Sequence, residues 1–509
     1  RMRHLVTGLT RRFVPLLCVG MLFAAASTRA QVDSTIAFVD VNVVPMDSER
    51  VLTRHTVVVQ GDRIISIDPA DEAVLPRGTR RIEALGKYLI PGLIDAHGRL
   101  LSDDYIDPGS VELELAVAVA NGVTTMRHAR GDPRLLRLRD RVAAEDVPFP
   151  ALYVSSPEIA SIPGAYGFNG RFVQSPFEGA SAVRQFREAG YDFVTMAAAN
   201  AADVYEGVML TARGSRMPLI GRIPAAVTLQ RALDAGQQIE FLDGYTEALA
   251  AAEPVPADGP SGSGLWQPDR WRLLGDVDDG RLEDVAQATV DAEVWNIPML
   301  AALRAALGLA PEEERGGAAA ERFISPTVRA ALRRAGQERE AQLPQPQLRR
   351  RYAELRDQIV RQIDRAGGKL MAGSGDPPWS APYGFGLYDE LAALAAAGMA
   401  PWAVLRAATA GPAEFLSFRG GGRAEYATVD EGGIRFTPTT NVDVDFGRID
   451  VGLRADLVLL SDNPLDDVAN VRLVEGVMLR GRWLPRDELD ALLARSAEVL
   501  GAAPLRSDY

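Results

Sequence analysis

The sequence predicts an α/β protein with a (β/α)8 TIM barrel and a composite β-sandwich built from both ends of the mature chain. Eight short apolar runs with strand character alternate with Ala- and Leu-rich helical patterns, and β-rich runs stand at both ends. The strand candidates are 89–96, 123–127, 150–155, 192–197, 217–221, 238–242, 296–301 and 369–373. Helical patterns between them include 111–120, 180–189, 227–235 and 386–398. A doubly wound open sheet is the alternative that this pattern leaves.

The sandwich is predicted from β-rich runs that lie outside the barrel. These runs are 36–44, 56–60 and 63–68 near the start and 455–460 and 474–481 near the end. Gly61-Asp62, between two of the early runs, has the composition of a hairpin turn. We therefore expect residues 31–87 and 413–509 to form the sandwich and a terminal helix, and residues 88–412 to form the barrel.

Two helical insertions interrupt the barrel pattern, at about 246–295 and at 311–366. Both follow the end of a predicted strand, where barrel enzymes place the loops that cover their active sites. The alternative is that both are surface additions with no part in binding.

Residues 1–30 have the composition of a signal peptide. Arginines precede an apolar run from 13 to 26, and small residues that suit a cleavage site follow it. The apolar run is shorter than the roughly 20 residues that span a bilayer, so a membrane anchor is the less favoured alternative. We expect an exported protein, either periplasmic or secreted.

Removal of this segment changes the chemistry that is open to the chain. It holds five arginines and no acidic residue, so its loss changes the formal net charge from −13 to −18. A nucleic-acid partner is therefore not expected. The single cysteine, Cys18, also leaves, so no thiolate metal site is expected. Only His55, His97 and His128 remain for imidazole chemistry.

Several segments carry a family resemblance. Pro-Gly-Leu-Ile-Asp-Ala-His at 91–97 and Gly-Val-Thr-Thr-Met-Arg at 122–127 resemble the first two barrel strands of the amidohydrolase superfamily, in its imidazolonepropionase-like and prolidase-like branch. Ala-Ala-Thr at 407–409 and Gly-Leu-Arg-Ala-Asp-Leu-Val at 452–458 resemble that family's exit from the barrel into the sandwich. The match runs from about Ile36 to Trp483, nearly the whole mature chain.

The resemblance implies hydrolysis of C–N bonds with one or two divalent metals, typically zinc. A metal lowers the pKa of its bound water toward about 7, and an aspartate beside it moves the proton. In the family pattern, strand one ends in His-x-His, strand four supplies a carboxylated lysine, strands five and six supply one histidine each, and strand eight supplies an aspartate.

This sequence departs from that ligand set at most positions. His97 stands at the first histidine of strand one, and Asp376 still supplies the strand-eight acid, which is the proton shuttle if the chain is active. The replacements are Arg99 for the second histidine, Thr195 for the lysine, Arg222 for the strand-five histidine and Phe241 for the strand-six histidine. The resemblance therefore implies a degenerate metal site.

A site for one zinc or other divalent ion is still open as an alternative. His97, His128 and Asp376 are all expected at the catalytic end of the barrel, and three ligands with one open position is the arrangement of a catalytic zinc. In the other interpretation no metal is bound, and His128 is a strand-end side chain held by hydrogen bonds.

The replacements also suggest a substitute for the metal. Arg99 and Arg222 are expected to point their guanidinium groups toward Asp376 and to neutralise it. The pocket, which Thr195 and Phe241 also line, would then bind an anionic small molecule or simply stabilise the barrel. The alternative for Arg222 is a solvated position on a loop.

Two classes of function follow from these predictions. The first is an amidohydrolase for non-peptide or dipeptide C–N bonds with reduced or lost hydrolysis. The second is a non-catalytic pseudohydrolase that binds an anionic small molecule or a partner subunit. Association into a homo-oligomer, or with a catalytically intact relative, is compatible with both.

Overall fold

The computed structural model describes residues 35–144, 147–162, 170–251, 271–310, 317–377, 379, 381–417, 425–430, 433–438 and 445–506. The predicted signal peptide, residues 1–30, lies outside the described residues. The elements described below all belong to one unit, Thr35–Tyr509. Among the helices of the described residues, none combines the length and the apolar character that crossing a membrane requires.

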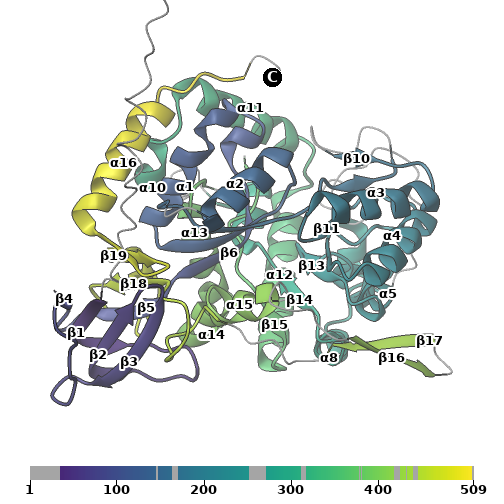
Figure 1. Ribbon diagram of the computed structural model, residues 1–509. Helices are drawn as coiled ribbons and strands as arrows, with labels where there is room; N and C mark the ends of the chain where they lie inside the picture. Colours follow the sequence, from purple (N-terminus) through teal and green to yellow (C-terminus); the bar gives the residue numbers. More distant parts are fainter. Residues whose placement is uncertain are drawn as a thin grey trace, which may run out of the picture. The chain divides into compact units, whose positions relative to one another are not determined.

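Strands from both ends of the chain share one mixed sheet (Figure 1). Its order is β20-β19-β18-β5-β1-β2-β3, and β4 pairs with β1. The strands are β1 Thr35–Val43, β2 Leu52–Gln60, β3 Arg63–Pro69, β4 Arg80–Glu83, β5 Tyr88–Pro91, β18 Leu457–Leu460, β19 Val474–Leu479 and β20 Arg482–Pro485. The predicted hairpin is present, with Gln60 paired to Arg63 across a turn in which Gly61 has φ 58°. These pairings make one connected sheet where we predicted a sandwich, and the domain boundaries stay predictions.

All eight predicted parallel strands are present, although most are shorter than expected. β6 Leu93–Gly98, β7 Val123–His128 and β8 Ala151–Val154 form one sheet. A second sheet has the order β10-β9-β11-β12-β13-β14-β15. Its strands are β9 Ile159–Ala160, β10 Arg171–Phe172, β11 Val194–Met196, β12 Leu219–Gly221, β13 Gln238–Glu240, β14 Trp295–Ile297 and β15 Lys369–Leu370. The two-residue strands β9 and β10 were not predicted, because such short pairings leave no apolar run to detect.

Backbone hydrogen bonds link the two parallel sheets at two places, without a continuous ladder. Ser156 N donates to Phe193 O at 2.9 Å, on the side where β8 approaches β11. Ala96 N donates to Ala372 O at 3.0 Å, which joins β6 to the segment that follows β15. The described fold is therefore mixed α/β with two linked parallel sheets, and the sheets are not closed into one.

Two predicted strands have different boundaries for identifiable reasons. The run 89–96 is divided at Gly92, whose N–H donates to Asp456 O and whose added Cβ would lie 2.0 Å from Thr124 Oγ1. The run 296–301 is only half a strand. β14 ends at Ile297, Met299 turns the chain with φ 50°, and helix α9 begins at Leu300.

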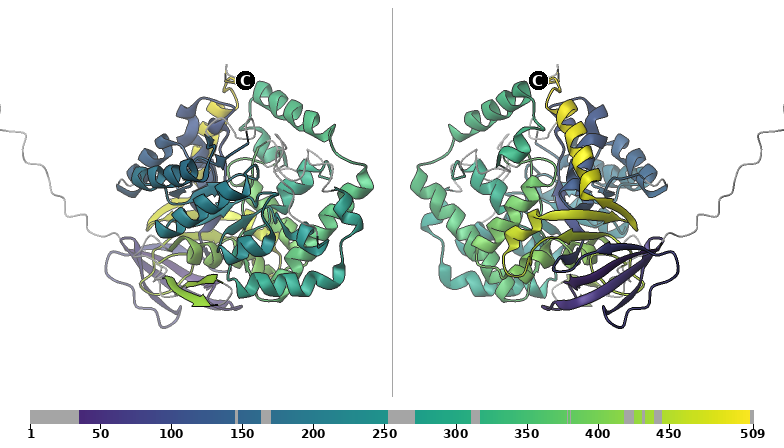
Figure 2. Two further views of the ribbon diagram at one scale, coloured as in Figure 1. Left: turned by 90° about the vertical axis from the view of Figure 1, so that its right-hand side faces the viewer. Right: turned by 90° about the vertical axis from the view of Figure 1, so that its left-hand side faces the viewer.

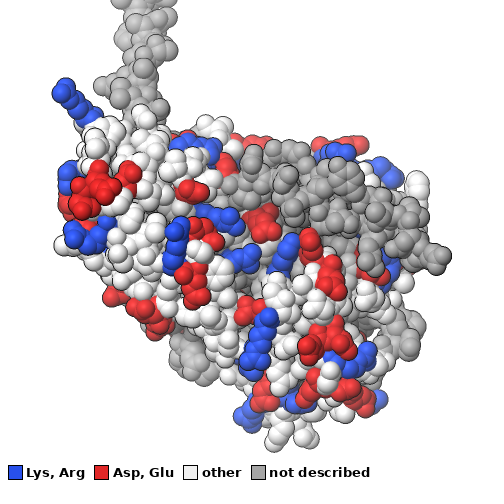
Figure 3. All heavy atoms as spheres, turned by 90° about the horizontal axis from the view of Figure 1, so that it is seen from below, with Lys and Arg blue, Asp and Glu red and all other residues white. Residues whose placement is uncertain are grey.

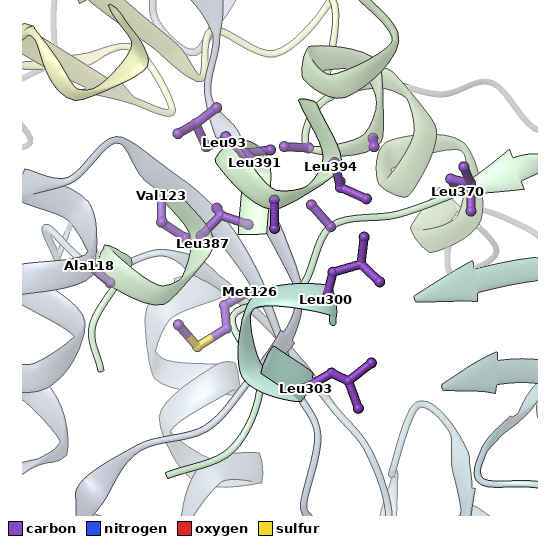
Figure 4. Close-up of a cluster of buried hydrophobic side chains, with 14 of the residues drawn as sticks. Leu93, Ala118, Val123, Met126, Leu300, Leu303, Leu370, Leu387, Leu391 and Leu394 are labelled. Carbon is purple, nitrogen blue, oxygen red and sulfur yellow. The ribbon is translucent and has the colours of Figure 1, made fainter. Parts of the chain in front are cut away.

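Helices pack against the strands and against one another through apolar side chains. They include α1 Val111–Ala120, α2 Pro133–Ala144, α3 Pro176–Ala189, α4 Ala202–Gly214, α5 Leu229–Asp234, α13 Phe385–Ala396, α14 Pro401–Ala407, α15 Ala410–Leu416 and α16 Arg486–Leu500. Leu387, Leu391 and Leu394 recur along α13 at helical spacing and lie beside Leu93 and Val123 in the core (Figure 4). Helix α1 has the bounds that the sequence predicted.

The two predicted insertions contain helices. The first holds α6 Tyr245–Leu249 and α8 Leu282–Asp291, on either side of residues 252–270, which lie outside the described residues. After α9 Leu300–Ala306, the second holds α10 Gly317–Glu321, α11 Pro326–Glu340 and α12 Pro346–Arg365. Ser325 caps α11, because its hydroxyl accepts a hydrogen bond from Val328 N before Pro326 starts the first turn. Figure 2 shows these teal and green helices on the side away from the purple strands β1–β3. A separate hairpin joins β16 Glu425–Asp430 and β17 Gly433–Pro438.

Acidic and basic side chains are intermingled on the described surface in Figure 3, with no broad area of one sign on that face. The chain carries 68 acidic and 55 basic residues. This distribution offers no basic groove on that face for a phosphate backbone. The absence of a nucleic-acid partner stays a prediction.

One buried carboxyl group leads to a prediction about pH and stability. Glu390 of α13 is fully buried, and its Oε2 accepts a hydrogen bond from Ala301 N at the start of α9 at 2.8 Å. Burial raises the pKa of Glu390 to about 7 from an ordinary 4.5, against a smaller opposite effect of this hydrogen bond. Between these pH values the folded chain keeps a proton that the unfolded chain releases, so stability falls as the pH rises through this window.

Glu390→Gln keeps the acceptor for Ala301 N and removes the ionisation. As the pH rises from 5 to 8, the free energy of unfolding of the parent should therefore fall by about 2 kcal/mol more than that of the variant. Urea unfolding at the two pH values measures this difference. Parallel pH dependence of the variant and the parent would show that Glu390 does not titrate in this window.

Candidate functional site

His97 lies at the centre of the candidate site, at the end of β6. The side chain is buried, and each ring nitrogen faces a carboxylate. Nδ1 lies 2.8 Å from Glu240 Oε1, and Nε2 lies 3.3 Å from Asp376 Oδ1. Burial lowers the pKa of His97, but the charges of Glu240 and Asp376 outweigh it and raise the pKa to about 9. Near pH 7 both nitrogens therefore carry a proton and donate it to carboxylates.

Glu240, the last residue of β13, connects His97 to a second buried cation. Arg127 of β7 is fully buried and donates to Glu240 Oε1 through Nη2 and to Ser155 Oγ through Nη1 at 2.8 Å. Burial alone would raise the pKa of Glu240, but His97 and Arg127 lower it to about 2. The carboxylate is therefore ionised and neutralised by two cations.

Arg99 extends the network on the other side of Asp376. Its guanidinium donates to Asp376 Oδ1 at 3.0 Å, to Asp103 Oδ2 at 3.0 Å and to Asp104 Oδ2 at 2.7 Å. Burial opposes ionisation of Asp376 and Asp103, yet the neighbouring cations hold the pKa of each carboxyl far below its ordinary value. We call His97, Arg99, Asp103, Asp104, Arg127, Glu240 and Asp376 the His97 network.

Asp95 fixes the geometry between His97 and Asp376. Its Oδ1 accepts hydrogen bonds from His97 N at 3.1 Å and from Ser374 N at 3.0 Å, so one carboxylate holds the end of β6 and the turn that carries Asp376. Gly373 permits this approach, because a Cβ there would lie 2.6 Å from His97 Cβ.

The structure brings only two of the three predicted metal ligands together. His97 contacts Asp376, as expected, but His128 lies against Asp103, with Nε2 3.2 Å from Asp103 Oδ2. Its Nδ1 lies 2.6 Å from Arg130 O and donates a hydrogen bond to this carbonyl. Arg99 contacts both Asp103 and Asp376, so a guanidinium joins the two histidine–carboxylate pairs where the mononuclear interpretation required a metal.

The two predicted pocket arginines differ in their partners. Arg99 contacts Asp376, as predicted. Arg222, which follows β12, instead forms a bidentate pair with Asp243, at 2.6 and 2.9 Å, and its guanidinium lies 4.5 Å from the ring centroid of Phe241. Phe241 meets the His97 ring edge to face at 5.7 Å. Arg222 was expected to neutralise Asp376, and this prediction is wrong because both hydrogen-bonded carboxylate oxygens belong to Asp243.

Thr195 occupies the middle of β11 and is buried. Its N–H donates to Ser156 Oγ at 3.1 Å, and its own hydroxyl finds no hydrogen-bond partner among the described residues. As expected, this residue belongs to one of the parallel strands. A threonine there cannot form the carbamate that the family pattern places on a lysine.

Sequence reasoning missed Glu240, Arg127, Asp103 and Asp104. A signal was present for the first two, because each is a charged residue at the end of an apolar strand run. The carboxyl ends of parallel strands meet at one edge, so two such residues of opposite charge are candidates for a buried pair. Asp103 ends the short 3-10 helix Leu101–Asp103 and Asp104 follows it, and neither residue gave such a signal.

The side chains present do not fit a divalent metal. Within the stretches that the structure describes, no group of three or more His, Cys, Asp or Glu residues is arranged to hold one. Both nitrogens of His97 are committed to carboxylates, and a metal ligand must offer a free lone pair. The Arg99 guanidinium contacts three of the carboxylates that could otherwise coordinate a cation.

Comparison with known proteins places the fold. No family model and no curated protein matches the chain. Three solved structures that do match are a putative prolidase from Bifidobacterium longum, bottromycin amidohydrolase and molinate hydrolase, at 23%, 21% and 17% sequence identity. The matches cover 91%, 92% and 94% of this chain and 99%, 91% and 99% of the other chain, in the same order. Their TM-scores are 0.61, 0.67 and 0.60. At these identities the likeness shows the fold alone. The predicted resemblance to the amidohydrolase superfamily is therefore confirmed as a likeness of fold.

Proposed function

We propose that this chain is a non-hydrolytic member of the amidohydrolase fold, in which the His97 network takes the place of the divalent metals. The observation that supports this proposal most directly is the commitment of both His97 nitrogens, to Glu240 and to Asp376. The proposal includes a (β/α)8 barrel, in which the Ser156–Phe193 and Ala96–Ala372 hydrogen bonds continue the two parallel sheets into one another.

The chemistry of hydrolysis supports the same proposal. Cleavage of a C–N bond by water needs a metal-bound hydroxide or a general base whose pKa lies near the working pH. With a pKa of about 9, His97 is already protonated near pH 7, and the pKa values of Glu240 and Asp376 are too low for either to take a proton efficiently. None of these three groups can serve as the base.

The arrangement also revises the ligand that the sequence suggested. A pocket for an anion needs cations with free hydrogen-bond donors. Arg99 already donates to three carboxylates, and Arg222 donates two hydrogen bonds to the carboxylate of Asp243. We therefore propose that the His97 network is a structural replacement for the metal, and that any small-molecule ligand binds without displacing it. Export and association with other subunits stay proposals from the sequence.

Metal content tests the proposed function. After growth with added zinc and manganese, the purified chain should contain far less than one metal per chain by elemental analysis, and Xaa-Pro dipeptides should not be hydrolysed. His97→Ala and Asp376→Ala should show the same low content as His55→Ala, a histidine outside the site. Stoichiometric metal that is lost in the first two variants and kept in the third would overturn the proposal.

A further inference from the structure

A short 3-10 helix, η1 Leu101–Asp103, carries one side of the His97 network. It begins two residues after Arg99, and its last residue, Asp103, accepts hydrogen bonds from Arg99 Nε and Leu100 N. Asp104 follows η1 directly and accepts a hydrogen bond from Arg99 Nη2. The position of η1 therefore decides whether the Arg99 guanidinium keeps two of its three carboxylates.

Glu114 of α1 holds the start of η1. Its side chain is fully buried, Oε2 accepts a hydrogen bond from Leu101 N at 2.7 Å, and Oε1 accepts one from Ser102 N at 3.1 Å. The first N–H groups of a helix have no acceptor within that helix, and here one carboxyl group satisfies two of them. Glu114 therefore links α1 to the segment that carries Asp103.

Glu114 has no counter-charge, in contrast to the acids of the His97 network. Within the described residues, no cationic side chain forms an ion pair with it. The titratable groups beside it are Asp103, which carries the same charge, and Tyr383 in the segment before α13. Burial and the Glu114 carboxylate raise the pKa of the Tyr383 phenol well above its ordinary value, so this group stays uncharged.

The described elements that pack on α1 bring no cation to Glu114 either. The 3-10 helix η2 Pro108–Ser110 has no charged residue, and the buried residues of α16 are uncharged, namely Leu489, Leu493, Ser496 and Leu500. The charged groups of β7 and β19 contact other partners: Arg127 contacts Glu240, His128 contacts Asp103 and Glu475 contacts Lys87. Arg506, which follows α16, donates to the backbone oxygen of Asp103.

Ionisation of Glu114 is costly in this environment. Two N–H groups replace only part of the hydration that a buried carboxylate loses, and the charge of Asp103 repels it. Burial accordingly raises the pKa of Glu114 to about 7 from an ordinary 4.5, while the hydrogen bonds from Ser102 and Leu101 oppose this effect and the charge of Asp103 adds to it. Release of η1 would let water reach the carboxylate and would remove the cost.

We propose that Glu114 is a pH-sensitive switch for η1. The protonated carboxyl group keeps η1 closed on the His97 network, and its ionisation favours an open form in which Arg99 loses Asp103 and Asp104. This inference rests on the proposed function, because the segment that moves carries one side of the replacement for the metal. The two can fail separately, since metal content tests the replacement and amide exchange tests the movement of η1.

Hydrogen exchange of the backbone amides of Asp104 and Tyr105 tests the switch. Both amides donate to Leu101 O, at 3.2 and 2.7 Å, so they report on η1 without being bonded to Glu114. The closed form keeps a proton that the open form releases between about pH 4.5 and pH 7, so closure weakens as the pH rises through this range. From pH 5 to pH 8, the protection factors of both amides in the parent should fall at least about tenfold.

Two matched variants isolate Glu114. Glu114→Gln removes the ionisation and should abolish most of this fall, whatever the level of protection at pH 5. Glu112→Gln changes a half-exposed carboxylate on the same helix, paired with Arg141, and should keep the fall of the parent. A contribution from His128, which also loses Asp103 on opening, is the same in all three proteins and cancels in the comparison.

The amides of β7 supply a reference for global unfolding within each protein. The proposal is overturned if the protection factors of Asp104 and Tyr105 do not fall in the parent, or if they fall equally in Glu114→Gln. An equal fall at the β7 amides also overturns it, because Glu114 would then act on global unfolding rather than on η1. The comparison with β7 in the parent needs no variant, so it decides the question even if Glu114→Gln does not fold.

Discussion

Replacing Arg99 by alanine should lower the free energy of unfolding by about 3–5 kcal/mol at pH 7, the cost of leaving buried charges without their partner. The Arg99 guanidinium is buried and donates to Asp376, Asp103 and Asp104. Without it, three carboxylates face one another across the end of β6. Urea unfolding followed by circular dichroism measures the loss.

The loss should depend on pH in a defined direction. In the parent, the pKa values of Asp376 and Asp103 are lowered, chiefly by Arg99 and His97 for the first and by His128 and Arg99 for the second, against the opposing effect of burial. Groups of this kind add stability above the carboxyl pKa of the unfolded chain, and that stability is lost as the pH falls toward the folded pKa. The difference between parent and Arg99→Ala should therefore be largest near pH 7 and shrink below about pH 4.

Two further variants separate charge from geometry. Arg99→Lys keeps the positive charge but offers one ammonium in place of a planar fork, so it should recover only part of the loss. Arg81→Ala removes an exposed arginine paired with Glu83, and should unfold like the parent. Equal effects of Arg99→Ala and Arg81→Ala would mean that the Arg99 contacts contribute nothing to stability.

The sequence predicted the parallel strands well because burial on both faces leaves continuous apolar runs, as in 123–127 and 192–197. It predicted the bounds of α1 to the residue, because this helix is followed almost directly by the strand β7, which leaves few positions where it could end. The ends of elements were less predictable. Met299, with φ 50°, turns an apolar run from strand to helix, and no local pattern distinguishes 296–301 from a longer strand.

A contact in the site was predictable where both residues stand at positions that the family resemblance assigns to the site. It was unpredictable where the partner comes from a distant part of the chain and the resemblance assigns it no role. Arg99 could be expected to contact Asp376, because the resemblance seen in the sequence assigns both positions to metal ligands. Glu240 contacts Arg127 and His97, which lie 113 and 143 positions away, so only the folded chain reveals the pairing. The prediction for Arg222 was wrong for a related reason. Phe241 and Leu242, both with positive φ, turn the chain after β13, and Asp243 lies against the guanidinium.

Replacing Glu240 by leucine should destabilise the chain about as much as Arg99→Ala, by roughly 3–5 kcal/mol, because Arg127 is fully buried and would lose its counter-charge. His97 would lose one of the two carboxylates that raise its pKa, and it would then face Arg127 Nη2, 3.3 Å from its Nδ1, without compensation. The pKa of His97 should therefore fall, which NMR titration of its ring protons measures.

The double variant Glu240→Leu/Arg127→Met decides whether the pair acts as a unit. Replacing a buried ion pair by apolar residues of similar volume removes the desolvation cost together with the attraction, so the double variant should be more stable than Glu240→Leu alone. Its His97 should keep Asp376 as a partner and no longer face a guanidinium, so its pKa should lie above that of the single variant. If the losses in free energy of unfolding caused by the two substitutions simply add, Glu240 stabilises the site through His97 rather than through Arg127. The contact between β6 and β13 would then be the part of the His97 network that matters most for the proposed replacement of the metal.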